Sequence, residues 1–574
     1  MSTVSSTSSS TSSSSTSSSS TTSNTTNLDN IDWNGLIEEA VQAKLDKADA
    51  IDLKITNNEA KSAAYTKMQT LLAAVETAAQ ALRAPSGTSM QSTDVFQSRA
   101  AYLTANGDVD ASTTLAATVE SGSTKGSYDL EVSQLAKSEK VGGTAVSSDS
   151  TDLGYSGVIA VGTDSSSLTD ITITSGMTLA EVAEAINNES DTTGVQASVL
   201  KVSSTQYQLV LATTDTGETI TANAVSGDDV LNTLGITASD GSFANVLQES
   251  AQAIFSVDGV QITRSSNDVD DVISGVTLHL YQTTPTDTSV TVEIGTDVSK
   301  VKDAISTLVD AYNAYRDFAY AQQSTTSTTT DDSGNTTTTD SVLFGDGTLR
   351  STNDSLSQAL NTMIDSNSLQ LLGLSLGDTN DLELDSDTLD NALLSNLDAV
   401  QSLLSFQMTS SSSDVRLLSR GTASVPDLTL DVAVDSSGAL TSASVGGDSS
   451  LFTVSGTRIV GATGSIYEGY TFVYTGTTSQ SIDLSFSSGI AEQLYNVTDA
   501  VSNTTDGSLE TLIDNISTTD DTLQNQSDDI RSAAATYKTN LTARYATVQA
   551  AIASAESSNT YLTTLIDTWN SSSS

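Results

Sequence analysis

Apolar residues recur with a 3.5-residue period at both ends of this chain, and this pattern constrains the fold more than any other feature. One stripe lies within residues 31–82 and the other within residues 509–569. Because this period is typical of helices packed along their whole length, we predict two long terminal helices, the second about 90 Å long. Asp32 or Asn34 can cap the first helix, and Pro85 is expected to end it. Neither helix can bury its stripe alone, so the two ends are expected to pack on each other.

The middle of the chain has a different character. Residues 97–296 alternate apolar and polar side chains between Gly, Asp and Ser turns, which predicts β-rich structure. One amphipathic helix, from Thr178 to Asn187, interrupts these strands. A helix is expected again from Val298 to Ala321, followed by a polar linker at 323–341 and further helical segments. A second β-rich insert has four glycines interpreted as turn residues: Gly456, Gly461, Gly464 and Gly469.

These patterns predict a multidomain α+β fold, with N- and C-terminal coiled-coil helices, a helical bundle, and β-rich domains inserted in the middle. The first 26 residues include 23 Ser or Thr. Nothing there can be buried to offset chain entropy, so the segment is expected to be a disordered solubilising tail, an export address or a glycosylation substrate. The expected domains are a disordered Ser/Thr-rich tail (1–28), a terminal coiled-coil leg (29–60 plus 500–574), a helical bundle (61–96 plus 297–413 plus 489–499), a β-rich head (97–150 plus 245–296), an inserted β-rich head domain with one helix (151–244) and an extra β-rich insert (414–488).

The charge balance excludes several classes of function. The chain carries 22 basic and 71 acidic side chains, a formal net charge of −49. Because affinity for nucleic acid comes mostly from Lys and Arg that neutralise phosphates, nucleic-acid binding is excluded as a main role. No segment approaches the roughly 18 consecutive apolar residues that span a bilayer, so no membrane insertion is expected. The first Lys is Lys44 and no apolar segment precedes it, so we expect no Sec-type signal peptide.

Signatures of catalysis are mostly absent. The chain has no cysteine and one histidine, His279, which excludes thiol chemistry and two-histidine metal sites. His279 lies in an alternating pattern and is interpreted as a structural strand residue. No P-loop or G-x-S-x-G motif occurs, and Gly345-Asp346-Gly347 is followed by Arg350 where a dinucleotide fingerprint needs Gly. We therefore expect no enzyme activity, no catalytic residues and no cofactor.

Two acidic clusters raise the question of metal binding. A Ca²⁺ loop needs alternating oxygen ligands, a Gly at its sharp turn and a bidentate Glu in the last position. Asp385-Ser386-Asp387 offers two ligand positions, but neither the Gly nor the Glu follows. Turn and helix-cap roles are therefore the better interpretation, and no metal site is expected. The clusters comprise Asp331, Asp332 and Asp340, and Asp378, Asp381, Glu383, Asp385 and Asp387.

Five stretches, in order along the chain, resemble the flagellar filament cap proteins, the hook-associated proteins of the FliD type. The most specific is AIFSVDGVQITRSSNDVDDVISGVTLHL at 253–280. The other four are LDNIDWNGLIEEAVQAK at 28–44, GSYDLEVSQLAKSEKV at 126–141, DVSKVKDAISTLVDAYNAYRDF at 297–318 and DLELDSDTLDNALLSNLDAVQSLL at 381–404. Two features depart from the family pattern: the Ser/Thr tail, and the 414–488 insert, which looks like a module of larger members.

The resemblance implies a ring-shaped homo-oligomer at the distal tip of the bacterial flagellum that chaperones flagellin insertion and polymerisation. It implies secretion through the flagellar type III apparatus, which agrees with the missing signal peptide and cysteines. The implied partners are further copies of the chain, flagellin, hook–filament junction proteins and a flagellar export chaperone.

The residues expected at an oligomer or filament interface belong to the terminal stripes. The equally weighted alternative is an ordinary seam within one chain. Two other functions stay open. One is a structural filament or hook–filament junction subunit. The other is a surface adhesin whose 414–488 domain or β plate binds host glycans or mucin; Tyr467, Tyr470 and Tyr474 are candidate contacts, although their spacing fits a buried strand face at least as well. The expected interface residues are Ile37, Val41, Leu45, Leu541, Val548, Ile552, Leu562 and Ile566.

Overall fold

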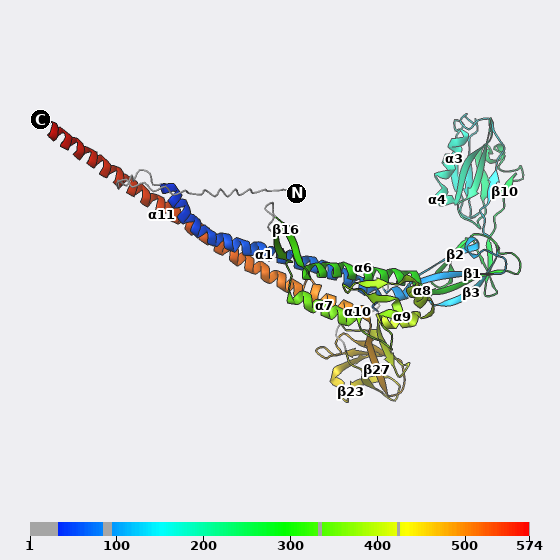
Figure 1. Ribbon diagram of the computed structural model, residues 1–574. Coiled ribbons are helices and arrows are strands. Elements are labelled where there is room, and N and C mark those ends of the chain that lie inside the picture. Colours follow the sequence, from blue (N-terminus) through cyan, green and yellow to red (C-terminus); the bar gives the residue numbers. More distant parts are fainter. Residues whose placement is uncertain (1–31, 84–93, 331–335, 422–424, 573–574) are drawn as a thin grey trace. The chain divides into compact units, whose positions relative to one another are not determined.

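The computed structural model describes residues 32–83, 94–330, 336–421 and 425–572 (Figure 1). The chain forms two compact units, one within Met1–Lys67 and Ser508–Ser574, the other within Met68–Gly507. Long helices and many antiparallel sheets alternate along the chain, which confirms the expected multidomain α+β fold. The nested domain division itself remains a proposal.

Both predicted terminal helices are present. They are α1 (Trp33–Leu82) and α11 (Ser508–Ser572), and each is continuous. Asp32 caps α1 as expected, because its carboxylate accepts a hydrogen bond from the Gly35 backbone N–H at 2.9 Å. The helix ends at Leu82, while Pro85, the expected stop signal, lies outside the described residues.

Five helices of the second unit cover the segments expected to be helical. They are α6 (Val298–Gln323), α7 (Gly347–Leu360), α8 (Ser386–Ser395), α9 (Leu397–Leu404) and α10 (Ile490–Ser502). The expectation of a polar linker at 323–341 was wrong. Its backbone forms an antiparallel pair, β16 (Thr325–Thr330) with β17 (Thr336–Asp340). Threonine is β-branched and favours strands, a propensity that outweighs the absence of an apolar stripe.

The first β-rich region has one core shared by two sheets. Leu130, Phe255, Leu278 and Val292 are among its fully buried residues. Its five-stranded sheet has the order β1 (Arg99–Asn106), β15 (Ser289–Thr296), β3 (Gly126–Gln134), β11 (Ala253–Val257) and β12 (Val260–Arg264), and its three-stranded sheet the order β13 (Asp268–Ile273), β14 (Val276–Leu280) and β2 (Leu115–Val119).

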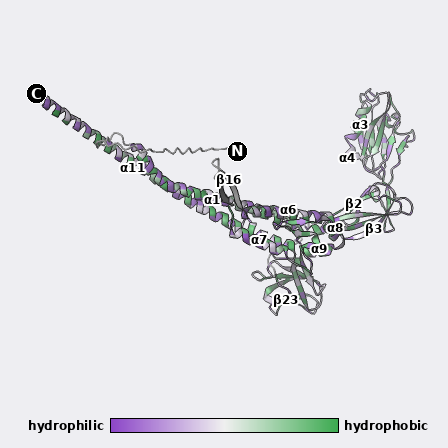
Figure 2. Ribbon diagram, in the orientation of Figure 1, coloured by the Kyte–Doolittle hydropathy of each residue, from purple (hydrophilic) through white to green (hydrophobic). Residues whose placement is uncertain are grey.

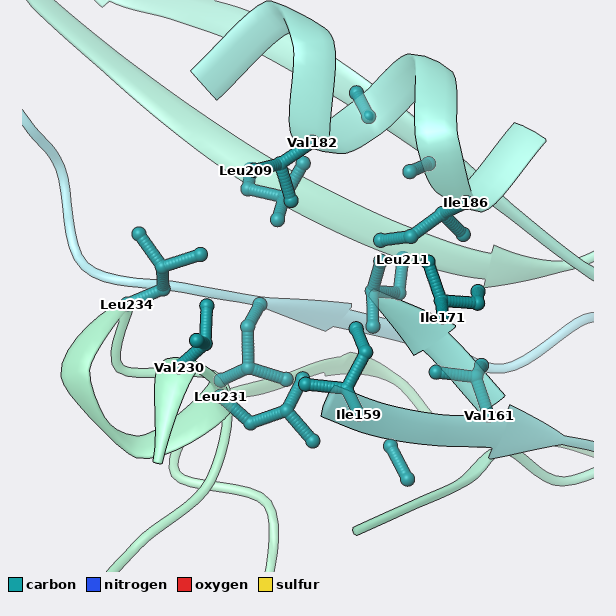
Figure 3. Packing of buried hydrophobic residues seen from close by; sticks show 14 of the residues in the cluster. Ile159, Val161, Ile171, Val182, Ile186, Leu209, Leu211, Val230, Leu231 and Leu234 are labelled. Carbon is teal, nitrogen blue, oxygen red and sulfur yellow. The ribbon is translucent and has the colours of Figure 1, made fainter. Parts of the chain in front are cut away.

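A second β-rich region is inserted into the first and carries the predicted helix, α3 (Leu179–Asn187). Thr178 and Glu181 form a capping box at its start. Figure 3 shows Val182 and Ile186 of α3 beside Leu209 and Leu211 in a closed apolar core. The sheets have the orders β10 (Val246–Gln248), β4 (Lys140–Gly142), β8 (Gln206–Thr213), β7 (Val195–Ser203), and β6 (Thr169–Ile173), β5 (Gly157–Gly162), β9 (Thr221–Gly227).

The third β-rich region consists of two four-stranded sheets around an aromatic core. It includes residues 406–410, which precede the expected insert 414–488, because β20 pairs with β27. The sheets have the orders β20 (Phe406–Ser410), β27 (Gln480–Ser488), β22 (Leu428–Val434), β23 (Leu440–Val445), and β21 (Val415–Ser419), β26 (Thr471–Tyr474), β25 (Arg458–Gly461), β24 (Phe452–Ser455).

Two expectations about this region need correction. Tyr467, Tyr470 and Tyr474 are buried in the core, so they form no exposed platform for glycans. The expected strand face is confirmed only for Tyr474 on β26, because Tyr467 and Tyr470 lie in the turn that precedes this strand. Gly461 is not a turn residue but the end of β25, where an added Cβ would lie 1.7 Å from the Tyr467 carbonyl oxygen. Gly456, by contrast, has φ +60° in the turn between β24 and β25, a conformation that glycine adopts without strain.

Candidate assembly interface

The helices α1 and α11 form an antiparallel coiled coil within the first unit. The rings of Trp33 and Tyr545 lie 5.1 Å apart at one end of the pair. At the other end, Asn58 Nδ2 donates a hydrogen bond to Asp520 Oδ1 at 2.6 Å. The contact pairs therefore have increasing residue numbers in α1 and decreasing residue numbers in α11, which shows that the two helices run in opposite directions. The expectation that the two ends of the chain pack on each other is therefore confirmed.

The apolar seam of this coiled coil unites half of the expected interface residues. Ile37, Val41 and Leu541 are only 5, 7 and 9% exposed and form one cluster with Ala534. Leu45 packs against the same cluster. These side chains thus contact each other within one chain, as a heptad repeat on two antiparallel helices predicts. Their part in oligomer or filament contacts remains a prediction.

Polar contacts flank the apolar seam and fix which residues of α1 lie opposite which residues of α11. Arg531 Nη2 lies 3.0 Å from Asp49 Oδ1 and 2.5 Å from Asp52 Oδ2, and Ser527 Oγ donates to Asp52 Oδ1 at 2.6 Å. The hydrogen bonds from Ser527 and Arg531 lower the pKa of the Asp52 carboxyl below its ordinary value. Ser527 is buried between the helices, whereas the Arg531 and Asp52 side chains are 42 and 41% exposed. The ion pair is therefore screened by solvent and adds little stability, and the contacts mainly fix how the two helices align.

The distal part of α11 continues the same stripe without an α1 partner. Figure 1 shows α11 extending beyond the start of α1, which begins opposite Tyr545. Val548, Leu562 and Ile566 are 38, 55 and 56% exposed, and Ile552 is half-buried. These four expected interface residues are therefore not brought into the seam. Among residues 546–572, only Glu556 and Asp567 carry charge.

Apolar and polar residues alternate along both helices, as the hydropathy colouring in Figure 2 shows. On α1 and proximal α11 the apolar positions face a partner helix, whereas on distal α11 they form an open stripe. We define the distal stripe as Val548, Ile552, Leu562 and Ile566. Its spacing continues that of Leu541 and Tyr545, so it has the geometry to accept another helix in the same manner.

The other singled-out residues have structural roles. His279 lies on β14, with Nδ1 2.6 Å from Asp268 Oδ1 and Nε2 3.4 Å from Thr118 Oγ1, which confirms the strand interpretation. Asp385 caps α8 by accepting hydrogen bonds from the backbone N–H groups of Asp387 and Thr388 at 3.1 and 3.2 Å.

Further members of the acidic clusters also serve turns. Asp381 accepts a hydrogen bond from Thr379 Oγ1 at 2.6 Å, which is the main reason for its lowered pKa. Asp346, between the two glycines of the weak dinucleotide match, caps α7. Asp331 and Asp332 lie outside the described residues.

The described part of the chain contains no group of three or more His, Cys, Asp or Glu residues placed to hold a metal ion. Within the same residues, no helix is both long and apolar enough to cross a membrane.

One buried cluster had no counterpart in the sequence-based expectations. Arg83, Arg420 and Glu492 form ion pairs in the second unit, although they are far apart in the sequence. Since no local spacing connects them, only the three-dimensional structure could identify this cluster.

Family models match three parts of the chain. The flagellar hook-associated protein 2 C-terminus matches residues 250–557, more than half of the chain. The N-terminus of the same family matches residues 29–139, and the flagellin hook IN motif matches residues 158–215, inside the second β-rich region.

Individual relatives agree with these matches. The B-type flagellar hook-associated protein 2 of Pseudomonas aeruginosa is 27% identical over 331 residues, 55% of this chain and 68% of that protein. Flagellar hook-associated protein 2 of Escherichia coli K12 is 28% identical over 333 residues, 55% of this chain and 69% of that protein. The crystal structure of the D1-D2-D3 domains of the flagellar cap protein FliD from Escherichia coli is 26% identical, with a TM-score of 0.42 over 60% of this chain and 90% of that one. The chain belongs to the flagellar hook-associated protein 2 family.

Proposed function

We propose that this protein caps the distal end of the bacterial flagellar filament and assists the insertion and polymerisation of flagellin beneath it. Family membership supports the location, and the exposed distal stripe of α11 is the observation that carries the mechanism. A long helix with few charges and an uncovered apolar stripe buries that stripe by packing against other helices. The role is structural, without catalysis.

In this mechanism the coiled coil is the leg, the β-rich regions within residues 97–296 form the cap plate, and the third β-rich region is an additional surface domain. The β-rich regions have closed cores, so they keep their shape without partners. The distal stripe becomes ordered against neighbouring subunits or the filament. A heterologous contact repeated around a closed rotation gives a ring, and a ring can end a filament without propagating it.

The proposed partners are further copies of this chain, flagellin, hook–filament junction proteins and an export chaperone. Export through the flagellar type III apparatus requires an unfolded chain. The absence of cysteine means that no disulfide opposes unfolding. The small number of buried residues in the α1–α11 seam also favours low local stability there.

A filament-subunit role and a cap role differ in the assemblies that they predict. Light scattering and negative-stain microscopy of the purified full-length protein separate them. Small closed oligomers are expected for the cap, whereas open helical polymers would contradict it. The burial of Tyr467, Tyr470 and Tyr474 removes the glycan contacts named for the adhesin alternative.

Motility provides the functional test. A strain that lacks this protein is complemented with the parent chain or with a variant carrying Leu562→Asp and Ile566→Asp. Filaments are expected with the parent and are expected to be missing with the variant. A variant with Thr564→Asp is the control, because this exposed residue lies on the other side of α11.

A further inference from the structure

A buried ionic cluster lies where the third β-rich region, residues 406–488, joins the helices of the second unit. Arg83 donates from Nε and Nη2 to the two carboxylate oxygens of Glu492, at 2.7 and 3.1 Å. Arg420 donates from Nη2 to Glu492 Oε2 at 2.7 Å. The three residues are 9, 6 and 4% exposed. They come from the end of α1, the segment after β21 and the first turn of α10, so one carboxylate connects three separate segments.

An aromatic ring packs against the planar face of each guanidinium group. Arg83 Cζ lies 3.6 Å from the centre of the Tyr495 ring on α10, and Arg420 Cζ lies 4.6 Å from the Phe406 ring on β20. Each arginine therefore has a carboxylate at its edge and a ring against its face. Because a guanidinium is planar, these two contacts together restrict its orientation more than either contact alone.

The backbone enters and leaves the β-rich region beside this cluster. Ser405 Oγ donates to the Leu82 carbonyl at 2.7 Å, and Gly489 N donates to the Ser405 carbonyl at 3.1 Å. A Cβ on Gly489 would lie 2.3 Å from the Leu404 carbonyl carbon, so the backbone between β27 and α10 passes very close to the end of α9. The entry and exit points are thus connected to each other and to the end of α1.

Burying two cations around one anion favours a single arrangement, because every displacement leaves a charge without its partner in a low-dielectric interior. We propose that Glu492 acts as a clamp, and that it holds the 406–488 region in one orientation against the helices as a rigid extension of the bundle. The proposal does not depend on the capping role.

Distance measurements between two spin labels test the clamp in the full-length protein. The chain has no cysteine, so Ser436→Cys in the turn between β22 and β23 and Gln358→Cys on α7 would supply its only thiols. Both positions are exposed. The parent with these labels is expected to give one narrow distance distribution. A distribution that is already broad in the parent would overturn the proposal.

The informative variant is Arg420→Met, which cuts the link to the β-rich region and leaves the Arg83–Glu492 pair intact. Nε of Arg420 has no hydrogen-bond partner among the described residues, so this change removes one paired donor only. The width of the distance distribution is expected to at least double. Arg264→Met is the matched control, since Arg264 pairs with Asp271 at 2.9 Å on the surface of another region, and it is expected to leave the width unchanged.

Glu492→Gln removes the shared charge and is expected to broaden the distribution further, with amide exchange at Gly489 at least tenfold faster. If Glu492→Gln does not fold, the Arg420→Met variant alone tests the clamp, because it keeps the charge-balanced pair of Arg83 and Glu492. A distribution as narrow as the parent's in Arg420→Met would overturn the clamp. Loss of amide protection in β22 and β27 of that variant would also overturn it, since the cluster would then support the core instead of the orientation.

Discussion

The proximal and distal parts of α11 share one helix and one repeat pattern, yet they have opposite environments. Up to Tyr545 the apolar positions face α1, and Ala534 and Leu541 are buried. Beyond Tyr545 the same spacing places Leu562 and Ile566 at the surface. This difference shows that a heptad repeat predicts an apolar helix surface suited to packing against another helix. Whether that surface is covered depends on which part of the folded chain lies next to it. Each of the following changes should affect one part and spare the other.

Deletion of residues 545–574 should have the largest effect. It removes the distal stripe and leaves the seam residues Ile37, Val41 and Leu541 in place. We expect the β-rich regions to stay folded and filament growth to be lost in a strain that lacks the full-length protein. Electron microscopy of the cells and circular dichroism of the purified variant check the two halves of this expectation.

Export must be controlled in that experiment, because a truncated chain that stays in the cell would also leave filaments uncapped. The amount of the variant in the culture medium supplies this control. Normal filaments from an exported truncation would refute the assignment of the legs.

Replacement of Leu541 by Ala should weaken the proximal part strongly. Removing a buried leucine side chain costs about 2–5 kcal/mol, and the lower end is expected here because Leu541 is still 9% exposed. Hydrogen exchange of the α11 amides should accelerate accordingly. Equal exchange in variant and parent would mean that the seam contributes no stability.

The same substitution in the distal part should leave the isolated protein nearly unchanged. Leu562→Ala removes an exposed side chain, so its free energy of unfolding is expected to differ from the parent's by less than about 0.5 kcal/mol. Filament capping should nevertheless be reduced, which swimming assays would reveal. A loss of thermal stability comparable to that of Leu541→Ala would show that distal α11 has a partner within the chain.

The smallest effect concerns pH. Hydrogen bonds from Ser527 and Arg531 lower the pKa of Asp52 in the folded protein below 3.8. The stabilisation that follows is present above the unfolded pKa and is lost as the pH falls through the folded pKa. Asp52→Asn should therefore remove a small part of the helix stability near pH 7, and this effect should disappear as the pH falls through the folded pKa of Asp52.

Acid titrations followed by circular dichroism measure this difference between Asp52→Asn and the parent. Asp514→Asn is the control, since Asp514 is exposed on α11. A shift of equal size in both variants would show that overall charge, and not the Asp52 contacts, is responsible.

Local patterns in the sequence determined many elements of this protein. The heptad spacing predicted α1 and α11, and Asp32, Thr178 and Asp385 mark helix starts by side-chain hydrogen bonds within a few residues. Alternation predicted the β-rich regions. Such signals suffice because helical periodicity and caps depend on neighbours in the sequence. The 323–341 segment was misjudged because threonine-rich strands have no apolar alternation. Gly461 was misjudged because its need for glycine comes from the Tyr467 carbonyl, which folds back against it six residues later in the chain.

Only the tertiary structure decided which apolar stripe is covered and which residues meet across the chain. The sequence could not separate Leu541 from Leu562, because both occupy equivalent positions in the repeat. Nor could it bring Arg83 and Arg420 to Glu492, or place Tyr470 in a core instead of on a surface. Burial and ion pairing depend on side chains hundreds of positions apart, and their energies arise only once folding has removed water from between them.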